Sequence, residues 1–274
     1  MRVRAFAKIN LSLRVLGTRS DGYHELRTIF QSIALHDTLT IRARRGAFTL
    51  TCDDPACPAD GTNLIYRAAA GLWRAAGRRG APRDVAIDLQ KRIPMQAGLG
   101  GGSSDAAAAL RALARRWRVG EAKVRTTAAA LGADVPYFLE GGAALGLERG
   151  DLLFRLAEPP ARWVVLVLPD FGVSTKDAFA WFDRDRPAPQ EHELVNDLEA
   201  PVAARHPEIA RIIAALRRSG ASHAAMSGSG SAVFGLFSGR ETAVEAARRL
   251  KASSRRALVT RTLNHQRYQA LAAT

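Results

Sequence analysis

Apolar and polar residues alternate from residue 3 to residue 16, at the start of the chain. Side chains that alternate with a period of two point to opposite faces of a β-strand. The apolar positions begin at Val3 and recur at every second residue to Val15, so the pattern predicts a strand with one buried face. Lys8, Asn10 and Ser12 then lie in a row on the opposite, polar face.

The rest of the first half mixes short apolar runs with longer segments of helical periodicity. A turn is expected at residues 19–22. Ser103, Ser104 and Asp105 are residue types that cap the start of a helix. The predicted strands cover residues 29–41, 48–52, 85–89 and about 143–147, and the predicted helices cover residues 63–76, 103–117 and 121–131.

The second half is predicted to contain strands at residues 163–168, 231–237 and 256–263, helices at 175–182, 241–251 and between Pro207 and Gly220, and a polar loop at 184–193. Pro207 is expected at the first helical position of its helix and Gly220 just past the end. Strands and helices that mix without strict alternation favour the α+β class over a doubly wound parallel sheet. A chain of 274 residues is long enough for two domains, which we expect at residues 1–155 and 156–274.

The chain carries 40 basic and 26 acidic residues, a net charge of +14. Such a charge is common in nucleic-acid-binding proteins. Here, however, the arginines are scattered over predicted helices and no series of aromatic residues accompanies them. We therefore expect no nucleic-acid partner, and a basic surface that attracts an anionic substrate. Only five of the 40 basic residues are lysines, so Lys8 and Lys91 stand out.

The sequence contains no apolar run long enough to cross a bilayer, and its first residues lack the apolar core of a signal peptide. These features predict no membrane partner and a cytoplasmic location. Cys52 and Cys57 have no further cysteine or histidine ligands at the spacing of a zinc site, so we interpret them as loop thiols. No metal-ligating residues are assigned.

The segment from Pro94 to Ser104, here called the glycine loop, joins a predicted strand to a predicted helix. Glycines let the backbone turn its N–H groups toward an anion, and the start of a helix adds a partial positive charge. A triphosphate is the natural ligand of such a loop. The loop lacks the Lys-Ser/Thr pair of a Walker A motif, and Ser103 stands where a dinucleotide-binding loop has its third glycine. A flexible linker is the alternative, but the flanking strand and helix argue against it.

The pattern Pro-x-x-x-Gly-Leu-Gly-Gly-Gly-Ser-Ser resembles the phosphate loop of the GHMP kinases, which are small-molecule kinases. Residues 7–11 (Ala-Lys-Ile-Asn-Leu) and 226–231 (Met-Ser-Gly-Ser-Gly-Ser) are similar to two other elements of that family. The resemblance implies a two-domain fold, with an ATP-binding and catalytic domain at residues 1–155. Residues 156–274 would then form an α/β-plait-like domain that contributes to substrate binding.

Residues 19–26, 63–65 and 132–136 are similar to the branch of the GHMP kinases that acts in the non-mevalonate isoprenoid pathway. This resemblance implies direct in-line transfer of a phosphoryl group from ATP, with Mg²⁺, to the 2-hydroxyl of a polyol linked to cytidine diphosphate. The partner would be that small molecule, and the enzyme a monomer or weak homodimer. The alternatives are a GHMP kinase acting on homoserine, mevalonate or a sugar, and a basic nucleic-acid-binding protein without activity.

Two residues are expected to be catalytic because of this resemblance. Asp134 follows a predicted helix end and would accept or orient the proton of the substrate hydroxyl. By its position alone it would be interpreted as a helix-capping residue. Lys8 would interact with Asp134 and with the hydroxyl, and would stabilise charge in the transition state. The alternative for Lys8 is a solvated side chain on the polar face of its strand.

The remaining candidate residues divide between the two substrates. Tyr23 would stack on the cytosine, His24 would read its edge, and Phe179 would close the other side, although core packing is an equal possibility for Phe179. Asn10 would bind the substrate diol, and Thr175 would contact substrate or cap a helix. Lys91, expected near the adenine, could instead be a surface charge, and Asp105 could touch Mg²⁺ or cap a helix. The expected ATP-binding residues are Asn63, Lys91, Pro94, Gly98, Leu99, Gly100, Gly101, Gly102, Ser103 and Ser104.

Overall fold

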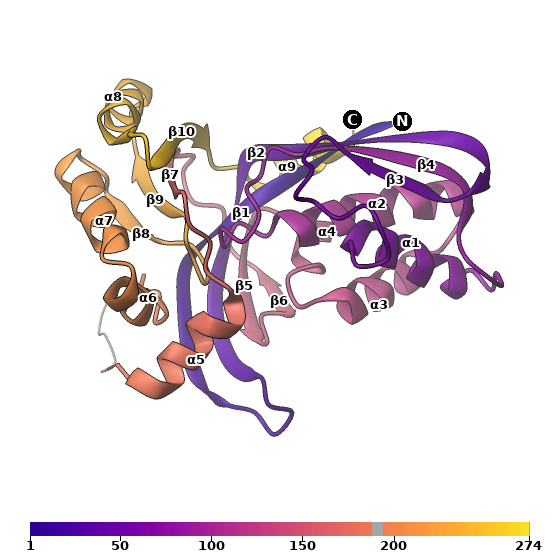
Figure 1. Ribbon diagram of the computed structural model, residues 1–274, viewed down its shortest axis with the longest axis horizontal. Coiled ribbons are helices and arrows are strands. Elements are labelled where there is room, and N and C mark those ends of the chain that lie inside the picture. The colour runs from indigo at the N-terminus through magenta and orange to yellow at the C-terminus, as the bar shows by residue number, and fades with distance from the viewer. Residues whose placement is uncertain (188–193, 274) are drawn as a thin grey trace.

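The computed structural model describes residues 1–187 and 194–273, which form two α+β units side by side (Figure 1). The first unit has a mixed sheet in the order β3-β4-β2-β5-β6, with β1 paired to β2. Only the β3–β4 pair is parallel. Its strands are β1 (Arg2–Thr18), β2 (His24–Ala47), β3 (Thr49–Cys52), β4 (Arg83–Gln90), β5 (Ala143–Glu148) and β6 (Leu152–Arg155).

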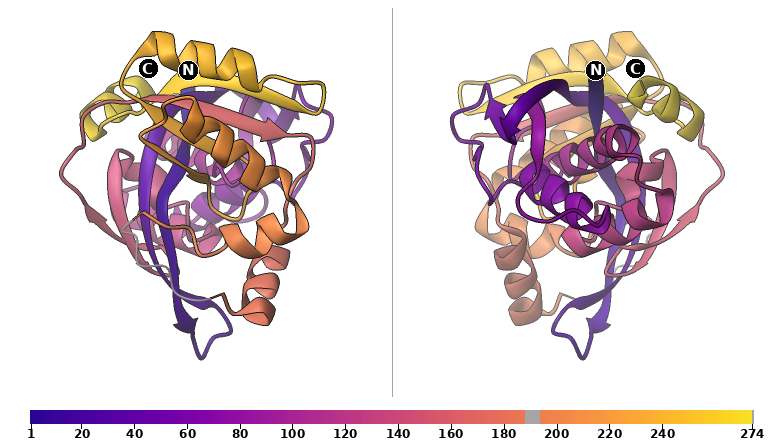
Figure 2. Two further views of the ribbon diagram at one scale, coloured as in Figure 1. Left: turned by 90° about the vertical axis from the view of Figure 1, so that its left-hand side faces the viewer. Right: turned by 90° about the vertical axis from the view of Figure 1, so that its right-hand side faces the viewer.

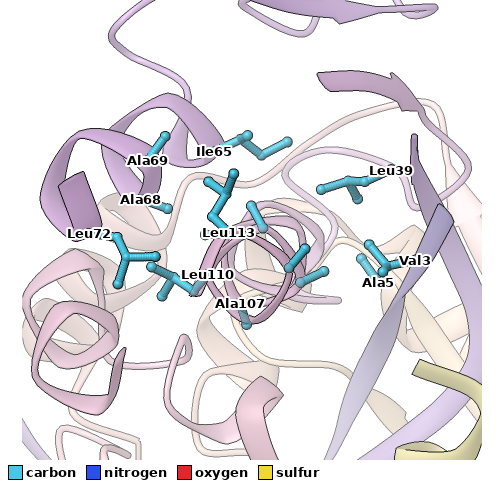
Figure 3. Close-up of a cluster of buried hydrophobic side chains, with 14 of the residues drawn as sticks. Val3, Ala5, Leu39, Ile65, Ala68, Ala69, Leu72, Ala107, Leu110 and Leu113 are labelled. Carbon is cyan, nitrogen blue, oxygen red and sulfur yellow. The ribbon is translucent and has the colours of Figure 1, made fainter. Parts of the chain in front are cut away.

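Four helices cover one face of this sheet: α1 (Leu64–Ala75), α2 (Gly101–Trp117), α3 (Glu121–Leu131) and α4 (Tyr137–Glu140). Helix α2 lies at the centre because its residues 106–109 are four alanines, which let neighbouring elements approach closely. Its Leu110 and Leu113 lie beside α1, and Val3 of β1 lies on its other side (Figure 3). This apolar cluster fixes where the start of α2, and therefore the glycine loop, meets the sheet.

The second unit is an antiparallel sheet in the order β10-β7-β9-β8. Its core joins the buried strand residues Val165 and Val167 to Ile212 and Leu216 of helix α7. The elements are β7 (Trp163–Pro169), α5 (Thr175–Asp185), α6 (Glu199–Arg205), α7 (Glu208–Arg218), β8 (His223–Met226), β9 (Val233–Phe237), α8 (Arg240–Leu250), β10 (Arg255–Arg261) and α9 (His265–Ala272).

Helix α9, at the end of the chain, packs against the first unit beside the start of β1 (Figure 2). The Tyr268 hydroxyl donates to the carbonyl of Phe138 at 2.7 Å, and the Tyr268 ring lies 5.5 Å from that of Phe6. The last residues of the chain therefore stabilise the N-terminal unit, although they follow the C-terminal one. Within the described residues, no helix is long and apolar enough to cross a membrane.

Every strand and helix predicted from the pattern is present, with shifted ends, and the α+β class is confirmed. The predicted loop at 184–193 begins later, because α5 extends to residue 185, and its residues 188–193 lie outside the described residues. Pro207 is the N-cap of α7 and not its first helical residue. Both cysteines are free thiols, with Cys52 ending β3. The pattern missed the short elements α4, α6, α9, β6 and β8.

One prediction about β1 is wrong: its alternating apolar residues do not share one face. The pairing of β1 with β2 shifts register between Phe6 and Lys8, as at a β-bulge. Val3 and Ala5 pack with the helices of the first unit, whereas Ala7 and Ile9 pack with the sheet of the second. The bulge exchanges the two faces, so Lys8 points to the helix side, where its Nζ lies 5.6 Å from the centre of the Phe30 ring.

The residues of the predicted polar face are also buried, so the alternative of a solvated Lys8 is wrong. Lys8, Asn10 and Ser12 are 4%, 2% and 4% exposed. The second unit contacts this part of β1 at two places: the loop at residues 226–231 contacts Asn10 and the glycine loop, and Ser12 Oγ donates to the Val195 carbonyl at 3.1 Å. Ser227 is the link, because its Oγ accepts from the Asn10 N–H at 3.3 Å and donates to the Gly98 carbonyl at 2.9 Å.

Gly98 is required at this contact. Its φ is +71°, and a Cβ built on it would lie 1.9 Å from the carbonyl oxygen of Ser227. Backbone on both sides of the contact leaves no flexible side chain that could move aside.

We therefore expect Gly98→Ala to lower the free energy of unfolding by about 1–3 kcal/mol more than Gly77→Ala, because of overpacking. Gly77 is the matched control, since it has φ +77° but nothing within 4 Å of its built Cβ. Its substitution carries only the strain of the left-handed backbone, about 1–2 kcal/mol. Denaturant titration of both variants measures the difference. Equal losses would show that the two units do not hold each other through Gly98.

Candidate active site

A cavity of about 1040 Å³ opens between the two units, lined by β1, the glycine loop, the turn before α4, the first residues of β2, and α5. All of the predicted site residues line it except Asn63 and Ser104. Residues far apart in the sequence thus surround one space. The prediction missed many of the lining residues, among them Thr28, Arg149, Lys176, Asp183 and Ser229.

The side chains of Ser104 and Asn63 form hydrogen bonds with the backbone and do not face the cavity. The buried Ser104 hydroxyl donates to the Phe6 carbonyl at 2.7 Å. Asn63 caps α1, since its Oδ1 accepts from the Ile65 N–H at 2.8 Å and its Nδ2 donates to the Pro58 carbonyl at 2.6 Å. Both side chains hold the elements that border the cavity.

The start of α2 is uncapped and faces the cavity. The helix begins at Gly101, two residues earlier than predicted, and its N-cap Gly100 has φ +71° and no side chain to cover the first turn. The prediction that serines and Asp105 cap this helix is wrong. The first N–H of the helix that finds a backbone acceptor is that of Ser104, which donates to the Gly100 carbonyl at 2.9 Å. The N–H groups of residues 101–103 are therefore free to bind an anion.

A lysine and a carboxylate meet beside this helix start. The Lys8 Nζ lies 3.6 Å from Asp134 Oδ2 and donates to Asn10 Oδ1 at 2.5 Å. The Asp134 side chain is 33% exposed, while that of Lys8 is 5% exposed. Asp134 lies in the turn between α3 and α4, as predicted. The carboxylate can therefore accept a proton from a group in the cavity, and the buried ammonium can stabilise the negative charge that results.

Asn10 orients Lys8 through a chain of hydrogen bonds. Its Nδ2 donates to Thr28 Oγ1 at 2.7 Å, and that hydroxyl donates to the Ser12 carbonyl at 2.8 Å. This fixes the Asn10 amide with its oxygen toward Lys8. Thr28 lies on β2, and only the pairing of β1 with β2 brings it here. No local pattern in the sequence singles it out.

The far end of the cavity is aromatic. The rings of His24 and Phe179 stack at 4.5 Å with an interplanar angle of 20°, and His24 Nε2 lies 2.8 Å from Asp183 Oδ1. Tyr23 is exposed, with the Arg149 guanidinium 5.4 Å from its ring centre. His24 thus covers one face of Phe179. A base held between Tyr23 and Phe179 stays a prediction.

Thr175 lies between these two ends of the cavity. Its Oγ1 is 3.2 Å from Ser229 Oγ of the loop at residues 226–231. The alternative reading of Thr175 as a helix cap is wrong, because Ser174 caps α5 by accepting from the Asp177 N–H.

Lys91 is a buried ion-pair partner and not a surface charge. Its Nζ donates to Asp37 Oδ2, and to Asp105 Oδ2 at 2.9 Å. Asp37 Oδ1 also accepts from the Ile93 N–H at 2.8 Å, so it connects the segment between β4 and the glycine loop to β2. The cluster of Asp37, Lys91 and Asp105 therefore lies beneath the glycine loop. Asp105 neither caps a helix nor lines the cavity.

In this cluster, burial and the neighbouring charges shift the pKa values of Lys91 and Asp105 in opposite directions. Burial alone would lower the pKa of Lys91, but the carboxylates of Asp105 and Asp37 outweigh it and raise that pKa above its ordinary value. Burial raises the pKa of Asp105 well above the ordinary value of 3.8, against the attraction of Lys91. Two carboxyls share one ammonium, and protonation of Asp105 brings the cluster to neutrality.

Two family models match the chain: the GHMP kinases N terminal domain over residues 63–142 and the GHMP kinases C terminal domain over residues 179–255. The fold is thus that of a GHMP kinase, a small-molecule kinase that uses ATP. A 4-diphosphocytidyl-2-C-methyl-D-erythritol kinase from Moorella thermoacetica is 43% identical over 94% of this chain and 98% of its own length. One from Solibacter usitatus is 46% identical over 87% of this chain and 81% of its own length.

A crystal structure of 4-(cytidine 5'-diphospho)-2C-methyl-D-erythritol kinase aligns with a TM-score of 0.81 and 36% identity, over 96% of this chain and 99% of that one. The chain belongs to the family of 4-diphosphocytidyl-2-C-methyl-D-erythritol kinases. A homoserine kinase from Cytophaga hutchinsonii shares the fold, with a TM-score of 0.70, at only 18% identity over 97% of this chain and 96% of that one.

The buried cluster predicts a pH-dependent stability. Because the pKa of Asp105 is raised in the folded chain, the folded state binds more protons than the unfolded state from about pH 4 upward, and stability falls as the pH rises through this range. Asp105→Asn removes this titration and keeps an oxygen that accepts from Lys91. The free energy of unfolding of the variant, relative to wild type, should therefore rise between about pH 4 and pH 7.

Urea titrations at several pH values measure this difference. Asp53→Asn is the control, because a hydrogen bond from the Lys91 N–H lowers the pKa of Asp53. The stability that the Asp53 carboxylate contributes is present above its ordinary pKa of 3.8 and is lost only below it, so the Asp53→Asn variant should differ from wild type by a nearly constant amount between about pH 4 and pH 7. A difference between Asp105→Asn and wild type that does not change with pH would contradict the prediction.

Proposed function

We propose that this kinase phosphorylates the 2-hydroxyl of 4-diphosphocytidyl-2-C-methyl-D-erythritol with ATP, by direct in-line transfer in the non-mevalonate isoprenoid pathway. The observation that carries the proposal is the contact between Lys8 and Asp134 beside the open start of α2. An acceptor alcohol bound in front of Asp134 would lie next to the start of α2, where we propose that the phosphates of ATP bind. The aromatic end of the cavity, with Tyr23 and His24, suits a cytosine.

In this mechanism Asp134 accepts the proton of the 2-hydroxyl as the phosphoryl group leaves ATP. Lys8 is held by Asn10 and stabilises charge on the attacking oxygen and on the transferred group. Backbone N–H groups of the glycine loop and of the first turn of α2 bind the β- and γ-phosphates. No phosphorylated enzyme intermediate is needed, because donor and acceptor occupy one cavity.

Mg²⁺ would enter with ATP and be held chiefly by the phosphates. Within residues 1–187 and 194–273, no group of three or more His, Cys, Asp or Glu side chains is placed to hold a metal ion. The hydroxyl of Ser103, at the cavity wall, is a possible protein ligand. When bound, the metal would neutralise charge on the β- and γ-phosphates.

The proposed activity also accounts for the charge of the protein and bears on its location, its partners and the roles of its domains. Both substrates are anions, so a net charge of +14 favours their approach. We propose a cytoplasmic enzyme, monomeric or weakly dimeric, whose partner is the small molecule with its cytidine diphosphate group and not a nucleic acid. Residues 1–155 would bind ATP, and residues 156–274 would contribute to the substrate site, with α9 returning to support the first domain.

Asp134→Asn tests the assignment of the base. The variant keeps the shape of the side chain but cannot accept the proton, so kcat should fall by about 10²–10⁴ while KM for ATP changes little. Steady-state kinetics measure both, with the exposed Asp170→Asn, outside the cavity, as control. Near-normal turnover by Asp134→Asn would remove Asp134 from the mechanism.

A substrate panel tests the acceptor. Transfer from labelled ATP should be fast with the cytidine diphosphate substrate and at least about 10²-fold lower in kcat/KM with the unattached polyol, because binding of remote groups contributes to catalysis. Homoserine and mevalonate serve as controls for the other GHMP activities. Preferential phosphorylation of either control would refute the proposed substrate.

A further inference from the structure

His24 is held from two sides by residues of one helix. Phe179 stacks on its ring, and Asp183 lies 2.8 Å from its Nε2. These two residues are four positions apart on α5, so they lie on the same face of the helix. His24 itself is the first residue of β2, in the other domain. The contact fixes the plane of the imidazole and the direction of both ring nitrogens.

The carboxylate determines which ring nitrogen carries the proton. A carboxylate only accepts hydrogen bonds, so whenever the imidazole is neutral its proton is on the Nε2 beside Asp183. The other nitrogen, Nδ1, is then an acceptor. The His24 side chain is 13% exposed and that of Asp183 is 52% exposed, so the pair borders the cavity with Asp183 on the solvent side.

We propose that Asp183 is a positioning residue that makes the site select cytidine over uridine, by holding His24 with its proton on Nε2. The inference rests on the proposed function, in which His24 reads the base. Cytosine has a single donor on its Watson–Crick edge, the 4-amino group, and an acceptor Nδ1 can pair only with that group. Uracil has a carbonyl oxygen at the same position, so two acceptors would face each other without a proton.

The selectivity for cytidine over uridine is set by the free-energy cost of placing His24 Nδ1 against the carbonyl oxygen of uracil. A site built to hydrogen-bond a particular group discriminates strongly against an analogue that lacks it, because its own polar atom is left unpaired. Stacking on Phe179 keeps the imidazole from turning to offer its other nitrogen. Helix α5 therefore determines both the orientation of the His24 ring, through Phe179, and the acceptor character of its Nδ1, through Asp183.

Asp183→Asn tests the proposal. An asparagine amide either accepts from Nε2–H or donates to a bare Nε2, so both imidazole tautomers become available. The ratio of kcat/KM for the cytidine substrate to that for its uridine analogue should fall about tenfold or more, mainly through KM. Both compounds are assayed at about pH 8, where an ordinary imidazole is neutral. Asp177→Asn, an exposed change of the same kind on the same helix, is the control and should keep the wild-type ratio.

A second measurement reads the tautomer directly. In protein labelled with ¹⁵N-histidine, the signals absent from His24→Gln belong to His24, and the wild type should show the Nε2–H form without substrate. In Asp183→Asn the same signals should move toward the Nδ1–H form. An Nδ1–H form in the wild type, or an unchanged cytidine-to-uridine ratio in Asp183→Asn, would overturn the role of Asp183. Absence of wild-type activity on the cytidine substrate would instead overturn the proposed function.

Discussion

The active site depends on the irregular pairing in β1. A regular strand would leave Lys8 on the same side as Phe6, away from helices α1 to α4, but the bulge between them reverses the faces. It also frees the Lys8 N–H from the sheet, and this group donates to the Leu99 carbonyl of the glycine loop at 3.0 Å. One local change in the backbone therefore directs the ammonium toward Asp134 and attaches the loop to the strand. β-Bulges commonly re-aim a side chain in this way beside active sites.

The second constraint is that neither domain contains the whole cavity. Ser227 joins Asn10 to Gly98, so the loop at residues 226–231 holds the catalytic strand and the glycine loop at a fixed separation. The same domain supplies α5, which carries Phe179 and Asp183 to His24. The open start of α2 and the aromatic group of Tyr23, His24 and Phe179 thus line the same space. Their separation is set by the interface between the domains and not by any single loop.

Local sequence patterns predicted those features that depend on neighbours in the chain. The glycine loop, its helix and the turn that carries Asp134 follow from glycine placement and helical periodicity. The bulge could not be predicted, because the alternation of apolar residues continues through it without interruption. Asp183 and Asp37 were also missed, since their partners His24 and Lys91 lie 159 and 54 residues away. Such contacts are set by tertiary packing, which leaves no periodic signal in the sequence.

The choice of lysine at positions 8 and 91 has a structural reason. Lys8 and Lys91 are buried, whereas Lys123, Lys176 and Lys251 are exposed. The two buried side chains end directly against the glycine loop: a Cβ on Gly100 would lie 3.2 Å from Lys8 Cε, and one on Gly101 would lie 3.1 Å from Lys91 Nζ. A planar guanidinium is wider than an ammonium and needs more donor partners in its plane, so arginine does not fit these positions. Gly100 and Gly101 therefore leave room beneath the loop for the two lysines, and for Phe138 and Ile93, whose side chains lie slightly closer.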